Sequence, residues 1–346
     1  MMPHNKIKVI KLLPFILLTF LNAQSCKSPT APEALQPGRR DYTWTADTIK
    51  TINDNLMLTR IWGITPTDVW AVGNSDWTAL TIWHYDGSRW NCDSTGRLNN
   101  PWAIIGFSSN EVWMGNTNST IWKFDGSQWS VYGTYKVAGF DETWIMNFDG
   151  TSSNNIYGVG SANMSNGSDY IGLIMHYDGI SWKILNIPPV KVGFGFCALD
   201  NNSGALIIGG TDFDTTGWVE KAYAWNGSQL NEIYSGSDEA AVSNINHNAY
   251  IDINKRIYKY KNGKLELWKN ISNTDCSGVI WCGRSESDFF IGSSTGIAHY
   301  NGSDFKTLYI TYGSNIMGGF IFEKDVFFIL HNFNTDINVI VHGKLK

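Results

Sequence analysis

The sequence predicts an all-β fold of seven similar antiparallel sheets, and three observations support this prediction. Aromatic residues make up 14% of the 346 residues and charged residues only 16%, a composition typical of β-rich proteins. A pattern of short apolar runs and tight turns recurs along the chain. Its period is about 40 residues, the length of one four-stranded blade of a β-propeller.

The repeat is clearest in three units, which run from Asp68 to Trp90, from Glu111 to Trp129 and from Asn155 to Trp182. In each, an aromatic residue precedes Asp-Gly, and Trp follows three residues past the glycine. With this glycine as the marker, seven units place it at positions 87, 126, 179, 227, 263, 302 and 343. We therefore expect seven blades with Asp-Gly or Asn-Gly hairpin turns, whose two central residues need positive φ.

The two ends of the chain each supply an incomplete unit. Asp41 to Trp44 repeats the spacing of the turn and its Trp without a strand before it, and the chain stops at Lys346 without a fourth strand. Propellers commonly close their ring by building one blade from both ends of the chain. We expect Tyr42 to Lys50 to form the outer strand of the blade at residues 319–346, within one domain of residues 41–346.

The repeated Val-Trp, Tyr-Asp-Gly and Ser-x-Trp segments resemble those of bacterial extracytoplasmic propeller-repeat lipoproteins and, more distantly, of YVTN and other WD40-like propellers. The resemblance covers nearly the whole mature chain and implies a fold, not an activity. The Asp-box of sialidase-type propellers does not match, because Asp and Gly are adjacent here and Trp lies three residues past Gly.

Residues 1–25 have the features of an export signal. Three lysines precede an apolar run from Leu12 to Leu21, which is too short to remain in a bilayer as a spanning helix. The stretch from Leu21 to Cys26 resembles a bacterial lipobox, although Ala23 stands where that pattern prefers Leu. The resemblance implies lipidation of Cys26; ordinary cleavage that leaves Cys26 as a thiol is the alternative.

Residues 26–40 contain three prolines and almost no apolar residue after Leu35, which is typical of a tether. We therefore expect a lipoprotein of the cell envelope, at the outer membrane or cell surface, with the periplasm also open. Signal removal takes away three lysines and no acid, so the net charge changes from −5 to −8. Binding to nucleic acid is not expected of so acidic a chain, and the membrane would be contacted only through the lipid.

Motifs for a cofactor or a metal are missing from the sequence: it has no CxxC spacing, Walker loop, dinucleotide fingerprint or HExxH. We expect a monomer without either. Cys276 and Cys282 could form a disulfide in an oxidising compartment.

Tryptophans divide into two groups. Those at recurrent repeat positions are expected to be buried and to have a structural role: Trp44, Trp70, Trp90, Trp113, Trp129 and Trp182. Five others fall in or beside the connections that share one face around the central channel, where propellers commonly bind ligands: Trp77, Trp102, Trp144, Trp218 and Trp281. We take these five as candidate ligand-binding residues, with packing at the rim as the alternative.

No catalytic constellation is evident. His84, His176 and His299 share one repeat position, which indicates a structural role. Gly292 to Gly296 matches the GxSxG pattern formally, but it falls in a loop between two strands and lacks the strand-to-helix turn of a nucleophile elbow. We expect a non-enzymatic binding or scaffold module whose partner is an envelope protein or a glycan.

Two further hypotheses remain open. A carbohydrate-active enzyme, either a glycosidase or a lyase, would need carboxylates that meet on the same face. The acids available in the fourth and fifth units are Asp212, Asp214, Glu220, Asp238 and Glu239. The other hypothesis is a structural partner in a larger secretion or adhesion complex.

Overall fold

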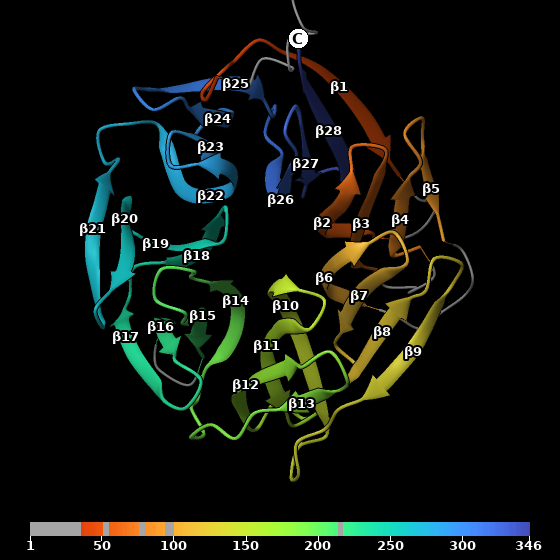
Figure 1. The fold of residues 1–346 in the computed structure, drawn as a ribbon, viewed down its shortest axis with the longest axis vertical. Helices are drawn as coiled ribbons and strands as arrows, with labels where there is room; N and C mark the ends of the chain where they lie inside the picture. The colour runs from red at the N-terminus through yellow and green to blue at the C-terminus, as the bar shows by residue number, and fades with distance from the viewer. Residues whose placement is uncertain (1–35, 51–54, 76–79, 94–99, 214–216) are drawn as a thin grey trace, which may run out of the picture. The chain divides into compact units, whose positions relative to one another are not determined.

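The computed structural model describes residues 36–50, 55–75, 80–93, 100–213 and 217–346. The expected signal sequence and Cys26 lie outside the described residues. Residues 36–346 form one compact unit of seven sheets, each of four antiparallel strands, arranged as blades around a central axis (Figure 1). No described segment is a helix long and apolar enough to cross a bilayer.

Each blade has an inner, a second, a third and an outer strand. The inner strands are β2 (Met57–Thr65), β6 (Pro101–Ser108), β10 (Glu142–Ser152), β14 (Gly193–Leu199), β18 (Ala240–Ile245), β22 (Cys276–Ser285) and β26 (Asn315–Ile321). The second strands are β3 (Asp68–Asn74), β7 (Glu111–Asn116), β11 (Asn155–Asn163), β15 (Leu206–Asp212), β19 (Asn248–Ile253), β23 (Asp288–Ser293) and β27 (Asp325–Asn332). Blades 1 to 7 are numbered in the order of these strands.

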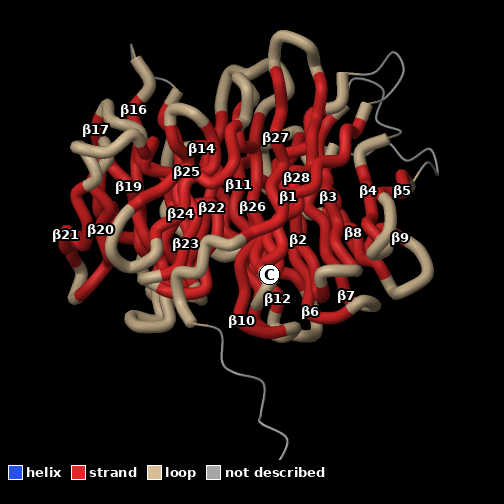
Figure 2. The backbone as a smooth tube through the Cα atoms, turned by 90° about the horizontal axis from the view of Figure 1, so that it is seen from above, coloured by secondary structure: helices blue, strands red, loops and turns tan. Residues whose placement is uncertain are grey.

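The third strands are β4 (Ile82–Tyr85), β8 (Thr120–Phe124), β12 (Tyr170–Tyr177), β16 (Val219–Trp225), β20 (Arg256–Lys261), β24 (Gly296–Tyr300) and β28 (Ile337–Leu345). The outer strands are β5 (Trp90–Cys92), β9 (Trp129–Thr134), β13 (Trp182–Ile184), β17 (Leu230–Gly236), β21 (Lys264–Asn270), β25 (Phe305–Ile310) and β1 (Tyr42–Ile49). The strands run between two ends of the propeller, with the connections gathered at both (Figure 2).

The ring closes through β1, the N-terminal strand, which pairs with β28 along its whole length. Trp44 lies opposite Gly343 in this register, and an added Cβ at Gly343 would come within 2.5 Å of the Trp44 ring. The predicted closure from both chain ends is therefore confirmed. Gly343, however, is not the turn glycine of the seventh unit, because it lies inside β28 as a platform for Trp44.

The hairpin turns between third and outer strands differ from the expected two-residue turn. At Asp86 and Gly87 only the glycine has positive φ, 91°. The Asp86 carboxylate instead accepts hydrogen bonds from the backbone N–H groups of Ser88 and Arg89, at 2.9 and 3.0 Å, which closes a longer turn. The expected pair of positive φ values occurs at Asn262 and Gly263, 49° and 80°.

Recurrent tryptophans pack between neighbouring blades. Trp70 in the second strand of blade 1 meets Trp129 in the outer strand of blade 2, with ring centroids 5.4 Å apart, and both are buried. Trp113 and Trp182 repeat the contact between blades 2 and 3 at 5.8 Å. Burial of these rings contributes strongly to the attraction between sheets, as expected for large apolar side chains.

A second recurrent contact joins the third strand to the start of the second strand in four blades. A histidine Nε2 lies 2.7–2.9 Å from a carboxylate or amide oxygen in the pairs His84–Asp68, His176–Asn155, His299–Asp288 and His342–Asp325. The structural role predicted for the first three histidines is confirmed. The match of His342 to these positions also shows that Gly343 follows the repeated histidine directly, where the other three units with this histidine carry Tyr.

Cys197, Cys276 and Cys282 are free thiols. Cys276 and Cys282 lie on the same strand, β22, and six residues of extended chain span roughly 20 Å. A disulfide needs Cα atoms within about 7 Å. The considered pairing of these two cysteines is therefore not formed.

Candidate functional site

The propeller has two chemically different ends. The inner strands begin at the end formed by the connections from second to third strands and from outer to inner strands, which we call the loop face. The opposite end, formed by the remaining turns, we call the turn face. The described chain begins on the turn face, where the guanidinium of Arg40 donates to the Asp304 carboxylate at 2.7 Å and to the backbone oxygen of His299 at 2.8 Å.

Exposed aromatic side chains gather at the loop face. Among the described residues, six large aromatic side chains are exposed there. They lie in the connections of this face or within the first four residues of the inner strands: Trp144, Phe196, Phe213, Trp218, Tyr312 and Phe333. The exposed large hydrophobic residues of the turn face are aliphatic, Ile64 and Ile180. Exposed rings at one end of a fold mark a surface suited to binding.

The five candidate tryptophans are placed differently by the fold. Trp77 lies outside the described residues. Trp218 is 72% exposed in the connection before β16, and Trp144 is 38% exposed near the start of β10. Trp102 and Trp281 are half-buried within the inner strands β6 and β22. The structure therefore brings Trp144 and Trp218 to the exposed surface of the loop face.

Trp218 belongs to an aromatic cluster at the junction of blades 3 and 4. Its ring centroid lies 6.0 Å from that of Phe213, which lies 5.8 Å from that of Tyr170. The backbone N–H of Phe213 donates to the Tyr170 hydroxyl at 2.6 Å, and this bond fixes the loop after β15 against blade 3. Phe213 also covers Gly193 at the start of β14, where an added Cβ would meet its ring at 3.1 Å.

The channel end of the loop face contains a cation, Arg60 of β2. Its Nη2 donates to the backbone oxygen of Met146 in β10 at 3.3 Å, and its guanidinium carbon lies 5.5 Å from the ring centroid of Phe196 in β14. Lower in the channel, the Asp149 carboxylate accepts hydrogen bonds from the Leu199 backbone N–H at 2.7 Å and from the Asn244 amide at 3.0 Å.

The described carboxylates near the aromatic cluster are engaged within the fold. Asp212 is buried and lies 3.3 Å from the Lys221 ammonium, and Glu220 accepts a hydrogen bond from the Thr211 hydroxyl at 3.1 Å. Burial raises the pKa of Glu220. Asp238 and Glu239 are exposed in the connection after β17, and Asp214 lies outside the described residues.

Other candidate chemistry is accounted for by local structure. The serine of the GxSxG match, Ser294, follows β23, and its backbone N–H donates to the backbone oxygen of Asp275 at 2.9 Å. The hydroxyl of the preceding Ser293 donates to the backbone oxygen of Gly296 across the hairpin at 3.0 Å. Within the described residues, no three His, Cys, Asp or Glu side chains are grouped closely enough to hold a metal ion.

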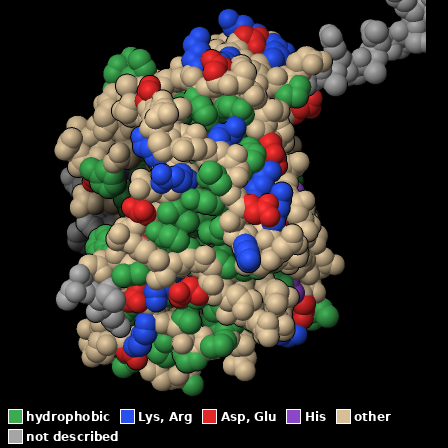
Figure 3. Space-filling view, turned by 90° about the vertical axis from the view of Figure 1, so that its left-hand side faces the viewer, with side chains coloured by type: hydrophobic (Ala, Val, Ile, Leu, Met, Phe, Trp, Pro, Cys, Tyr) green, Lys and Arg blue, Asp and Glu red, His purple; other side chains and the backbone are tan. Residues whose placement is uncertain are grey.

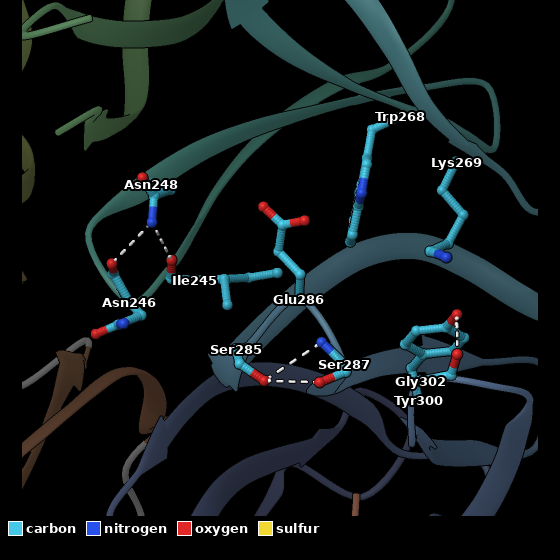
Figure 4. A pocket seen from close by; sticks show the side chains of 10 residues that line it. All are labelled: Ile245, Asn246, Asn248, Trp268, Lys269, Ser285, Glu286, Ser287, Tyr300 and Gly302. Carbon is cyan, nitrogen blue, oxygen red and sulfur yellow. Dashed lines mark hydrogen bonds between the residues drawn. The ribbon is translucent and has the colours of Figure 1, made fainter. Parts of the chain in front are cut away.

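A separate groove runs between blades 5 and 6, on the side of the molecule shown in Figure 3, where hydrophobic patches alternate with charged side chains. It comprises two cavities of about 500 and 480 Å³ that share Lys269 and Tyr300 as lining residues. In the first, near the turn face, Glu286 points between Ile245 and Trp268 (Figure 4).

The rings in this groove are covered by lysines and are not free to stack on a ligand. Lys259 and Lys269 lie 5.1 and 4.9 Å from the centroid of Trp268, and Lys269 lies 4.1 Å from that of Tyr300. Glu286 is paired with Lys259 and accepts from the Tyr250 hydroxyl at 2.9 Å. The loop face therefore presents the freer aromatic surface and is the stronger candidate site.

Several residues of this face were missed in the sequence because only tryptophan was considered as a ligand-binding ring. Phe213 and Phe333 fall in second-to-third connections, as Trp218 does, and Tyr312 falls in an outer-to-inner connection of the same face, so their positions in the repeat indicated this face. The sequence also contained a sign that Arg60 is unusual, because it is the one charged residue in the run from Met57 to Trp62.

No family model matches the chain, and no curated protein sequence does. A structure of a catalytically inactive virginiamycin B lyase from Staphylococcus aureus with quinupristin is similar to it, with a TM-score of 0.61 at 12% identity, covering 86% of this chain and 99% of that one. A structure of YCF48 bound to D1 peptide has a TM-score of 0.57 at 13% identity, covering 90% and 98%.

The WD40 β-propeller domain of Doa1 has a TM-score of 0.56 at 9% identity, covering 87% of this chain and 96% of that one. At such identities the likeness concerns the fold alone. Together with the seven four-stranded sheets, these neighbours show that the chain is a seven-bladed β-propeller with WD40-like relatives in structure.

Proposed function

We propose that this protein is a non-enzymatic binding or scaffold module of the cell envelope, which captures an envelope protein or a glycan on its loop face. The observation that carries the proposal is the gathering of exposed rings there, with Trp218 72% exposed and Tyr312 85% exposed. Aromatic side chains supply large contact areas at little conformational cost, and they dominate the energetics of many interfaces.

The point at which the described chain enters the propeller supports a loop face that is directed away from the membrane. The chain enters the propeller at the turn face, through the contacts of Arg40 with blade 6. A lipid on Cys26 would therefore be joined to the propeller through a chain that enters it at the end opposite the loop face. Ten residues, 26–35, precede the described unit, and they could extend over at most about 35 Å. A membrane anchor of this kind would leave the exposed rings accessible to a partner.

Engagement of the described acids supports binding over hydrolysis. Glycosidases need two carboxylates at a set separation across the scissile bond. At the loop face Asp212 is neutralised by Lys221, and Glu220 is held by Thr211. These contacts serve the packing of β15 against β16.

The proposal is tested with a glycan array and a pull-down from envelope extract, using the mature chain with Cys26→Ser. The change Trp218→Ala, alone and with Phe213→Ala, should reduce capture at least tenfold while the melting temperature falls by less than a few degrees. The matched control is Ile180→Ala, which removes an 82% exposed side chain from the turn face and should leave capture unchanged.

Equal loss of capture in Ile180→Ala would refute a site at the loop face. Release of reducing-end or unsaturated product from a polysaccharide, abolished by Asp212→Asn, would establish the carbohydrate-active alternative instead. The anchor is tested separately by mass spectrometry of the mature N-terminus and by fractionation. Cys26→Ser should lose a diacylglyceryl-sized mass and move the protein from the membrane to the soluble fraction.

A further inference from the structure

Arg60 extends across the mouth of the central channel. It is the fourth residue of β2 in blade 1, yet it contacts the Met146 backbone oxygen in blade 3 and the Phe196 ring in blade 4. Because the inner strands begin at the loop face, these early strand positions lie toward that end of the channel. Phe196 is 45% exposed and Arg60 is half-buried, so solvent reaches the site.

The positive charge of Arg60 is not balanced within the described part of the fold. Its described hydrogen bonds go to the backbone oxygens of Thr59 and Met146, and its Nε, although buried, has no described partner. Burial lowers the pKa of Arg60 to about 10, and among the described ionisable groups only the Cys197 thiol opposes this shift. That thiol is neutral at pH 7, because burial raises its pKa well above the usual value.

A partly buried cation without an anion costs folding free energy, and the cost is repaid when a ligand supplies the negative charge. Arginine also presents parallel N–H donors that match a carboxylate in a two-pronged hydrogen bond. The carboxyl group of Asp149 already accepts hydrogen bonds from Leu199 and Asn244, and burial raises its pKa. Arg60 is thus the group with unused bonding capacity.

The surroundings of Arg60 favour a polypeptide over an acidic glycan. Of the described side chains, the exposed ring of Phe196 lies against the Arg60 guanidinium, while the Asn147 amide oxygen already accepts from the Cys197 thiol at 3.4 Å. Arg60 presents donors only, so a sugar hydroxyl that accepts from it would still need an acceptor for its own proton. An apolar side chain next to a carboxylate would bury against Phe196 while its charge meets Arg60.

We propose that Arg60 forms the ion pair with a carboxylate of a polypeptide partner, either the C-terminal carboxylate or an Asp or Glu side chain beside an apolar residue. The inference rests on the proposed function, since it names the partner class and the anchoring residue of the loop face. The exposed rings around the channel mouth would then supply contact area, and Arg60 would supply the selection for negative charge.

The test is selection from a random hexapeptide library by the mature chain with Cys26→Ser, with captured peptides identified by mass spectrometry. One library has free C-termini and a second has amidated C-termini. If an acidic side chain is the ligand, peptides with Asp or Glu should be enriched at least tenfold over their Asn- and Gln-containing counterparts in both libraries. If the C-terminal carboxylate is the ligand, capture from the free library should exceed capture from the amidated library at least tenfold. Either preference should vanish in Arg60→Gln.

Two further variants keep the result interpretable. Arg60→Lys retains the charge but not the two-pronged geometry, so it should keep a reduced preference for carboxylates. Arg60→Met removes the charge while filling a similar volume, and its urea midpoint should equal or exceed that of the parent, because an uncompensated buried charge has been removed. A clear loss of stability in Arg60→Met would assign Arg60 to structure and overturn the inference.

The outcomes separate this inference from the proposed function. Capture of peptides with the same charge preference by the parent and by Arg60→Gln overturns the role of Arg60 and leaves the loop face as a binding surface. Binding of oligohexuronates without capture of any peptide overturns the polypeptide class. Absence of capture from both the libraries and the envelope extract overturns the proposed function as well.

Discussion

At the scale of single residues, buried titratable groups set the response of this protein to pH. Asp252 in β19 is buried, its Oδ2 has no described hydrogen-bond partner, and an added Cβ at Gly278 of the next blade would collide with its Oδ1. Burial, reinforced by the charge of Glu239, raises the pKa of Asp252 to about 6. The carboxyl therefore fits its site better when it is protonated.

The sign of the effect follows from this raised pKa. The folded state binds the proton more tightly than the unfolded state, so Asp252 lowers stability as pH rises from about 4 through 6. Asp252→Asn should raise the free energy of unfolding by about 1–2 kcal/mol at pH 7.5 and change little at pH 4.5. Urea unfolding at the two pH values measures this, and a loss of stability at pH 7.5 would contradict it.

His299 shows the opposite dependence. Burial lowers its pKa, against the opposing effect of Asp288, so proton binding favours the unfolded state. Its contribution to stability is complete above about pH 6.5 and is lost as pH falls through the lowered folded value. Burial also acts to raise the pKa of Asp288, but the hydrogen bond from His299 and the charge of Arg284 lower it overall.

Loss of the buried His299–Asp288 contact should lower the free energy of unfolding more than loss of the equivalent, more exposed His84–Asp68 contact. His299→Ala leaves the Asp288 carboxylate short of a donor in a buried setting and should cost about 2–4 kcal/mol at pH 7.5. His84→Ala removes the equivalent contact to Asp68, where the histidine side chain is 33% exposed, and should cost about 1 kcal/mol. Equal losses measured by urea unfolding would show that the repeated pair contributes the same in every blade.

At the scale of elements, the strand that closes the ring allows a coupled test. Trp44→Ala removes a half-buried ring from the contact between β1 and Gly343 and should cost about 2 kcal/mol. Gly343→Ala places a Cβ within 2.5–2.8 Å of the Trp44 ring and should also destabilise, because the ring must move.

The double variant should lose less than the two single losses added together, since removal of the Trp44 ring makes room for the methyl group that Gly343→Ala introduces. The four proteins are compared by thermal unfolding at one pH. Strictly additive losses would mean that Trp44 does not rest on Gly343.

The sequence could predict the blades because their signals are local. The Asp-Gly pair at Asp86 and Gly87 recurs before an outer strand in several units, and the Trp three residues later marks that strand. In the last copy the prediction was wrong, because Gly343 was assigned to a turn and instead lies inside β28. A glycine stands at position 343 because the Trp44 ring of β1 packs directly on it. This contact joins residues some 300 positions apart, so no local sequence pattern contains it.

The candidate site was less predictable for the same physical reason. Trp218 could be assigned to a connection, but whether an inner-strand ring points outward depends on the twist of the strand and on its bulges. Trp144 is exposed, while Trp102 and Trp281 on equivalent inner strands are half-buried. The contacts of Arg60 could not be predicted from the sequence, because they depend on the fold that brings β10 and β14 close to β2.

At the scale of the whole molecule, stability depends on an unbroken ring. The apolar clusters each join neighbouring sheets, as with Trp113 of blade 2 and Trp182 of blade 3, and the cluster of blade 7 with blade 1 includes Ile49 from the N-terminal strand. Each blade is thus supported from both sides. Removal of one outer strand exposes an edge and weakens two interfaces together.

A chain that begins at residue 55 lacks β1 and should therefore unfold at a markedly lower temperature, in a broader transition than the closed ring. A synthetic peptide of residues 39–50 supplies the missing strand and should raise the midpoint temperature as its concentration rises. At 100 times its dissociation constant it should add about 2.7 kcal/mol to the free energy of unfolding. The same peptide with Trp44→Ala should need a higher concentration, because it cannot rest on Gly343. Calorimetry at a series of peptide concentrations measures this, and an unchanged midpoint in the shortened chain would show that β1 does not close the propeller.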